Sequence, residues 1–194
     1  MFSRVAFRLA VVIVLATASY GAAAQEPVLS GGPYVPTPQR VVDAMLGIAG
    51  VTDRDYVIDL GSGDGRIVIT AAQKYGARGK GYDIDDELVG RSNVAARKLN
   101  LEQRVRFEQR DVLQADVREA TVITLYLLPE MMRALRARLL RELRPGTRIV
   151  SHDFDFGDWK PERTVSLDLD EKYDVSGSWS STIHLWIVPP RAAK

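Results

Sequence analysis

Three glycines stand at alternate positions in the stretch Asp59-Leu-Gly61-Ser-Gly63-Asp-Gly65, which follows one apolar run and precedes another. A glycine loop between a strand and a helix lets backbone N–H groups approach a ligand closely. The N-terminus of the following helix favours negative charge on that ligand. The stretch therefore predicts a small-molecule site formed largely by the backbone.

The spacing of the glycines argues against two common nucleotide loops. The dinucleotide fingerprint G-x-G-x-x-G, begun at Gly61 and Gly63, requires glycine or alanine at position 66, where the sequence has Arg66. The phosphate loop G-x-x-x-x-G-K-[ST] also fails, because no Lys-Ser/Thr pair follows. A nicotinamide-dependent oxidoreductase is thus a poor interpretation, and a titration with the nicotinamide cofactor would test it.

The form D-x-G-x-G-x-G resembles motif I of the class I S-adenosylmethionine-dependent methyltransferases. Their cofactor, S-adenosyl-L-methionine, has no pyrophosphate, but its ammonium, carboxylate and sulfonium groups need close backbone and an acid. The resemblance implies cofactor contacts along the whole loop, from Asp59, Leu60, Gly61, Ser62, Gly63 and Gly65.

Two further acids fall where this resemblance places them. Asp83 ends the second predicted strand and would bind the ribose hydroxyls, with Ile84 beside it. Asp111 follows the third strand and would lie near the adenine amino group, with Val112 beside it. Both acids belong to the carboxyl edge of a parallel sheet, where α/β proteins bind ligands. The alternative is that Asp59, Asp83 and Asp111 are all ordinary turn residues.

Segments outside the core narrow the resemblance. Tyr34-Val-Pro-Thr37-Pro and Tyr126-Leu-Leu-Pro-Glu130 resemble the mitochondrial seven-β-strand methyltransferases that modify lysines of the ATP synthase c-subunit and the adenine nucleotide translocase. Many small bacterial methyltransferases show the same arrangement, and the likeness spans residues 33–159. It implies a lysine or another amine as methyl acceptor. An N-P-P-Y motif, used by amide and adenine N-methyltransferases, is lacking.

Site roles follow from the same resemblance. Tyr34 and Thr37 would fold across the methionine end of the cofactor, and Tyr126 would line the acceptor side. Each has a structural alternative: Tyr34 as a turn residue, Thr37 as an N-cap with Pro38 at the first helical position, and Tyr126 as strand core.

A lysine acceptor must lose a proton from a group whose solution pKa is roughly 10.4. Asp153 and His152, at the end of the fifth predicted strand, are the candidate bases. The alternative for His152, and the more common one for a histidine at a strand end, is a hydrogen-bonded structural residue. With two histidines and no cysteine in the chain, we expect no metal site.

The elements that must position these residues alternate between strand and helix. A helix is predicted from Thr37-Pro38 to Gly50, and Thr164–Asp170 and Ile183–Val188 are predicted as a final strand pair around a turn-rich segment at 174–181. Between them we predict strands at 56–60, 79–84, 105–109, 122–127 and 147–153 and helices at 66–75, 86–99 and 129–143. This order predicts an α/β fold: a Rossmann-like doubly wound sheet, mostly parallel, with a C-terminal antiparallel strand pair.

The N-terminus has the pattern of a signal peptide over residues 1–24. Arg4 and Arg8 precede the short apolar run Leu9–Ala18, and an A-x-A pattern ends at Ala24. A loop at 25–36 and a single methyltransferase domain at 37–194 complete the predicted organisation. The location would be periplasmic or secreted; an uncleaved segment would instead anchor the chain to the cytoplasmic face of the inner membrane, the one case in which we expect membrane association.

Charge and location bear on function. The net charge is +1 over 194 residues, and removal of residues 1–24 would leave 24 basic and 25 acidic residues, so we expect no nucleic-acid partner. S-adenosylmethionine is made in the cytoplasm, and export would separate the protein from it. This tension motivates an alternative function, a non-catalytic ligand-binding module of the cell envelope that retains the cofactor fold.

Overall fold

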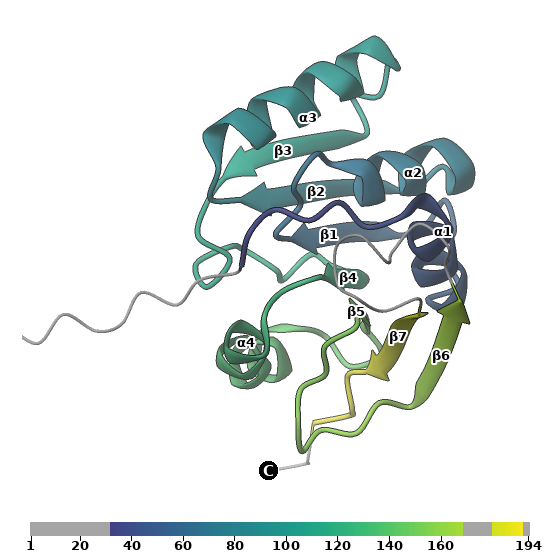
Figure 1. The fold of residues 1–194 in the computed structure, drawn as a ribbon, viewed down its shortest axis with the longest axis vertical. Coiled ribbons are helices and arrows are strands. Elements are labelled where there is room, and N and C mark those ends of the chain that lie inside the picture. The colour runs from purple at the N-terminus through teal and green to yellow at the C-terminus, as the bar shows by residue number, and fades with distance from the viewer. Residues whose placement is uncertain (1–31, 169–179, 192–194) are drawn as a thin grey trace, which may run out of the picture.

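A computed structural model describes residues 32–168 and 180–191, which form one seven-stranded sheet with helices on both sides (Figure 1). The predicted signal peptide, most of the loop at 25–36 and most of the turn-rich segment at 174–181 lie outside the described residues. Within them, no helix is both long and apolar enough to cross a bilayer.

Elements form where the hydrophobic patterns predict them. The strands are β1 (Tyr56–Leu60), β2 (Arg78–Asp83), β3 (Val105–Gln109), β4 (Val122–Leu125), β5 (Arg148–His152), β6 (Arg163–Asp168) and β7 (Ser180–Ile187). The helices are α1 (Gln39–Ile48), α2 (Arg66–Tyr75), α3 (Asp86–Lys98) and α4 (Pro129–Glu142).

The strand order is β3-β2-β1-β4-β5-β7-β6. Strand β1 pairs in parallel with both β2 and β4, whereas β7 pairs antiparallel with β5 and β6. The chain runs outward from β1 to β3 and then returns to β4 on the other side of β1. This reversal leaves a crevice at the carboxyl ends of β1 and β4, the usual ligand position in such sheets. The predicted fold class is confirmed.

Two apolar layers hold the sheet, with α1 and α4 on opposite sides of β4, β5 and β7 (Figure 1). Met132, Leu135 and Leu139 of α4 are fully buried against one face, together with Trp186. The inward residues of α1 pack against the other face with Val57, Val122 and Val150. Residues 122–125 are buried without alternation, as expected for a strand covered on both faces.

Two local predictions at the site are wrong. Helix α1 begins at Gln39 with Pro38 in the cap position and no side-chain cap, so Thr37 is not an N-cap. Its hydroxyl instead lies 3.5 Å from Nδ1 of His152 on β5. Strand β4 ends at Leu125, one residue before Tyr126, so Tyr126 is not strand core.

Candidate functional site

A cavity of about 570 Å³ opens at the carboxyl ends of β1, β2 and β4. Its outer wall is the segment 32–37, which we call the strap, and its floor is the glycine loop after β1. Further lining residues lie at or after the ends of β2, β3, β4 and β5, among them Asp83, Asp111, Tyr126, Met131 and Phe154. The cavity therefore lies at the point where the topology predicts a ligand.

The glycine loop is shaped by backbone conformations that favour glycine. Gly63 has φ of +53°, and an added Cβ would lie 2.6 Å from the ring of Tyr34 on the strap. The amides of Gly61 and Ser62 both donate to the carbonyl of Tyr82 on β2, which fixes the loop to the sheet. A side chain at position 63 would displace the strap from the loop.

Gly65 gives a test of this loop that is separate from the cavity lining. Its φ is +79°, and an added Cβ would lie 2.6 Å from Phe107 and 2.9 Å from Ser92. We expect Gly65→Ala to lower the free energy of unfolding by about 2–4 kcal/mol, from left-handed strain and overpacking. Gly90→Ala, on the exposed side of α3 with no atom within 4 Å, should raise it by about 0.5–1 kcal/mol. Thermal unfolding of both variants checks this pair; similar changes in the two would contradict it.

Asp59 is a buried carboxylate with one unused oxygen. Its Oδ1 accepts a hydrogen bond of 2.6 Å from Thr124, but Oδ2 and the nearby Ser62 Oγ have no partner among the described residues. Burial, and then the charges of Asp83 and Asp64, raise the pKa of Asp59 to about 7. An unpaired buried carboxylate is costly, so the site favours a ligand that brings positive charge and a hydrogen-bond donor.

Asp83 and Asp111 both line the cavity. Asp83 Oδ2 accepts a 2.7 Å hydrogen bond from the amide of Gly63, and its Oδ1 accepts one of 3.0 Å from the amide of Asp85. Asp111 Oδ1 accepts from the amide of Leu113 at 2.9 Å. These bonds fix the orientation of each carboxylate while leaving further lone pairs to accept from a ligand.

The remaining predicted cofactor residues divide into two groups. Ile84 and Val112 line the cavity, Ile84 as a largely exposed side chain and Val112 as a buried one. Leu60 and Gly65 do not line it: Leu60 is fully buried in the core below, and Gly65 packs against Phe107 and Ser92.

The predicted catalytic residues are brought together, but only Tyr126 lines the cavity. Its half-buried ring stacks on Phe154 at 6.3 Å and lies 4.0 Å from the ring of His152. His152 is 1% exposed, behind that ring, with Nε2 2.9 Å from Ser181 Oγ. Asp153 accepts a 2.9 Å hydrogen bond from the amide of Thr182. Its carboxylate also lies 3.5 Å from His152 Nε2. Because neither residue lines the cavity, a catalytic role for either stays a prediction.

Comparison with known proteins decides the family. The model of the ANTKMT methyltransferase domain matches residues 59–163. A protein-lysine N-methyltransferase of Saccharolobus islandicus is 37% identical over 157 residues, covering 80% of this chain and 93% of that protein. The chain belongs to the ANTKMT methyltransferase family.

Two other relatives of this methyltransferase bear on its ligands. The adenine nucleotide translocase lysine N-methyltransferase of Mus musculus is 32% identical over 149 residues, which are 75% of this chain and 64% of that protein. The crystal structure of an RNA methyltransferase from Salinibacter ruber, with bound S-adenosyl-L-homocysteine, is 47% identical with a TM-score of 0.73. That match covers 82% of this chain and 97% of the other. Together these matches show that the 194-residue chain is an S-adenosylmethionine-dependent methyltransferase.

The cavity of the methyltransferase fits this cofactor. The unpaired Oδ2 of Asp59 suits a cationic donor, and Gly61 and Gly63 line the cavity without side chains. Asp83 and Asp111 would hold the ribose hydroxyls and the adenine amino group. When bound, S-adenosylmethionine supplies a methyl group on a positively charged sulfur. Among the described residues, no group of three histidine, cysteine, aspartate or glutamate side chains is arranged to hold a metal ion.

Sequence reasoning missed several residues of the methyltransferase site. Phe154, Asp64 and Arg66 line the cavity without having been predicted as site residues, and Thr124 supports Asp59 from β4. Arg66 was visible only as the residue that breaks the dinucleotide fingerprint. Phe154 follows the candidate base Asp153 directly, and that adjacency is the one sequence signal that would have pointed to it.

Proposed function

We propose that this methyltransferase transfers a methyl group to the ε-amino group of a protein lysine. The observation that carries the proposal is the charge of the cavity. Its lining contains five carboxylates (Asp59, Asp64, Asp83, Asp85 and Asp111) and, among the described residues, a single basic side chain, Arg66. Arg66 is itself paired with Asp64. Asp59, Asp83 and Asp111 are expected to serve the cofactor, and Asp64 neutralises Arg66, so the described lining presents no unpaired cation that would repel the amine of a lysine acceptor.

An RNA acceptor is the competing class, because the Salinibacter ruber relative is described as an RNA methyltransferase. RNA binding rests largely on lysine and arginine contacts to phosphates, and these contacts make it depend on salt. The near-neutral net charge of the chain gives such contacts little support. The relatives described as lysine methyltransferases favour the amine.

The acceptor side suits the stem and the amine of a lysine. Tyr126, Phe154, Leu128 and Met131 line it with aromatic and aliphatic surface. Such surface buries the methylenes, and desolvation lowers the pKa of the amine toward the neutral nucleophile. Burial, and then the charge of Asp153, raise the pKa of the Tyr126 hydroxyl, so it stays protonated and acts as a hydrogen-bond donor. Proton removal would fall to solvent.

The test is a methyl-transfer screen with labelled S-adenosylmethionine. Envelope and cytoplasmic extracts are both used, because residues 1–24 predict either export or an anchor. We expect label that protease removes and ribonuclease leaves, and mass spectrometry should place it on lysine. Label that only ribonuclease removes would replace the proposal with an RNA acceptor.

Phe154→Ala separates the acceptor wall from the cofactor site. Phe154 stacks on Tyr126, so its loss should leave the acceptor poorly positioned. We expect kcat/KM for the acceptor found in the screen to fall about 10-fold or more, with the Kd for adenosylhomocysteine within twofold of the parent. Steady-state kinetics and calorimetric titration measure the two. An equal loss in both would show that Phe154 serves the cofactor instead.

A further inference from the structure

The strap is attached to the glycine loop by one side chain of α2. Arg66 donates from Nη1 to the carbonyl of Thr37 at 2.8 Å. The same guanidinium is bound by the carboxylate of Asp64, through Nε at 2.9 Å and Nη2 at 2.6 Å. One fork therefore joins the end of the strap to the loop that forms the cavity floor.

The other end of the strap meets the same loop. The ring of Tyr34 lies against Gly63, closely enough that a methyl group there would overlap it. Burial, and then the carboxylate of Asp64, raise the pKa of the Tyr34 hydroxyl. Burial opposes ionisation of Asp64, but the hydrogen bonds and charge of Arg66 outweigh it and hold the pKa of Asp64 below its usual range. The Asp64–Arg66 pair is thus charged at neutral pH and faces both strap residues.

We propose that Arg66 is a positioning residue that holds the strap closed over the cofactor cavity and thereby sets the rate at which cofactor and product leave. All six strap residues line the cavity from outside, and the glycine loop lines it from below. A ligand between the two leaves once the strap moves, and strap movement breaks the bond from Arg66 to Thr37. The inference depends on the cofactor site and is independent of the acceptor.

Lysine could not replace Arg66 fully. The planar guanidinium donates to Asp64 from one edge and to the Thr37 carbonyl from another. An ammonium is instead a single point charge on a flexible stem. Arg66→Lys keeps the charge and loses the fork. It should therefore fall between the parent and Arg66→Ala.

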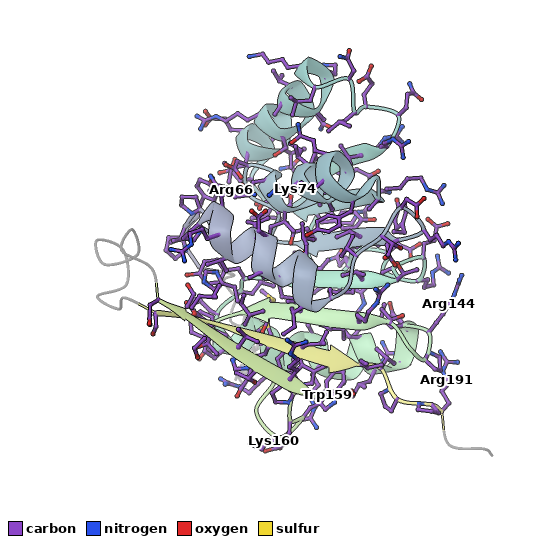
Figure 2. All side chains as sticks on the ribbon, turned by 90° about the vertical axis from the view of Figure 1, so that its right-hand side faces the viewer. Arg66, Lys74, Arg144, Trp159, Lys160 and Arg191 are labelled. Atoms are coloured by element: carbon purple, nitrogen blue, oxygen red, sulfur yellow. The ribbon has the colours of Figure 1, made fainter. Side chains whose placement is uncertain are left out.

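Lys74→Ala is the matched control. Lys74 lies on the same helix as Arg66 (Figure 2). It forms an ion pair of 2.6 Å with Asp43 of α1, so it also joins α2 to a neighbouring element. It does not line the cavity. Both substitutions remove one cation and one inter-element contact, and only Arg66→Ala releases the strap.

The first measurement is the dissociation rate of labelled adenosylhomocysteine, chased with excess unlabelled ligand. We expect Arg66→Ala to dissociate at least 10-fold faster than the parent, Arg66→Lys to lie between, and Lys74→Ala to stay within twofold. Equal rates in Arg66→Ala and Lys74→Ala would overturn the proposal. A failed acceptor screen would leave these rates unaffected, so the two proposals fail separately.

The second measurement needs no ligand. Chymotrypsin cleavage after Tyr34, followed by mass spectrometry, reports how often the strap leaves the cavity. We expect faster cleavage at this bond in Arg66→Ala than in Lys74→Ala, at temperatures where thermal unfolding shows both variants to be folded. Equal acceleration of cleavage in both variants would indicate general loosening of α2. It would contradict a specific role of Arg66 in holding the strap.

Discussion

Replacing Asp83 by alanine is expected to raise the Kd for S-adenosylmethionine at least 100-fold. A carboxylate that accepts from two ribose hydroxyls contributes two charge-assisted hydrogen bonds, each worth roughly 1.5–3 kcal/mol. Losing both corresponds to about two orders of magnitude or more in affinity. The substitution also frees the amides of Gly63 and Asp85, which Asp83 now fixes. The floor of the cavity therefore loses its order along with its ligand contacts.

Asp86→Ala is the control for this substitution. Asp86 lies three residues further on, in the first turn of α3, exposed and outside the cavity lining. Asp86→Ala removes the same charge as Asp83→Ala, three residues away. Calorimetric titration of the two variants should give a large loss for Asp83→Ala and a Kd within about twofold of the parent for Asp86→Ala. Unchanged affinity in Asp83→Ala would refute the assignment to the ribose.

The fold and the three acids that meet in the cavity could be predicted because their signals are local. Alternating strands and helices with clear apolar patterns determine a doubly wound topology, and that topology brings every strand-end acid to one edge. Asp59, Asp83 and Asp111 are each recognisable from the few residues around them. Their meeting in one cavity follows from the parallel sheet, without any knowledge of side-chain contacts.

The parts that could not be predicted depend on contacts between distant segments. Arg66 binds the carbonyl of Thr37, 29 residues away, and the Thr37 hydroxyl lies beside His152, 115 residues away. Thr37 before Pro38 has the composition of a helix cap, but the strap carries it into a buried position beside β5. No local pattern reports such tertiary contacts, and here they outweigh the capping preference.

Two buried aspartates at the ends of β1 differ in their partners, in their pKa and in their effect on the stability of the fold. Asp55, just before the strand, is paired with Arg148 and accepts from Thr121 and Thr52. Burial opposes its ionisation, but these partners outweigh burial and lower the pKa of Asp55. Asp59, near the other end of β1, has one hydrogen bond and a pKa raised to about 7. Asp55 stabilises the fold, whereas Asp59 is costly to it.

Asp59→Asn is therefore expected to stabilise the cofactor-free protein and to weaken cofactor binding. An unfolded aspartate has a pKa of about 3.9, below the folded value of about 7, so the folded chain binds the proton more tightly. The stability from this protonation is fully present below pH ~4 and is lost as the pH rises through 7. Asparagine is neutral throughout. The stability advantage of asparagine should grow between about pH 4 and 7 and stay constant above, reaching on the order of 4 kcal/mol.

Thermal unfolding from pH 5 to 8 and titration with S-adenosylmethionine check both halves of this prediction. We expect the Tm of Asp59→Asn to exceed that of the parent by several degrees at pH 8 and by less at pH 5. The Kd should rise at least 10-fold, because a neutral amide cannot balance the positive charge of the ligand. Asp55→Asn should instead lower the Tm, since it breaks a buried pair with Arg148. A lower Tm in both variants at pH 8 would show that Asp59 stabilises the fold, and the unpaired carboxylate would then no longer mark the cofactor site.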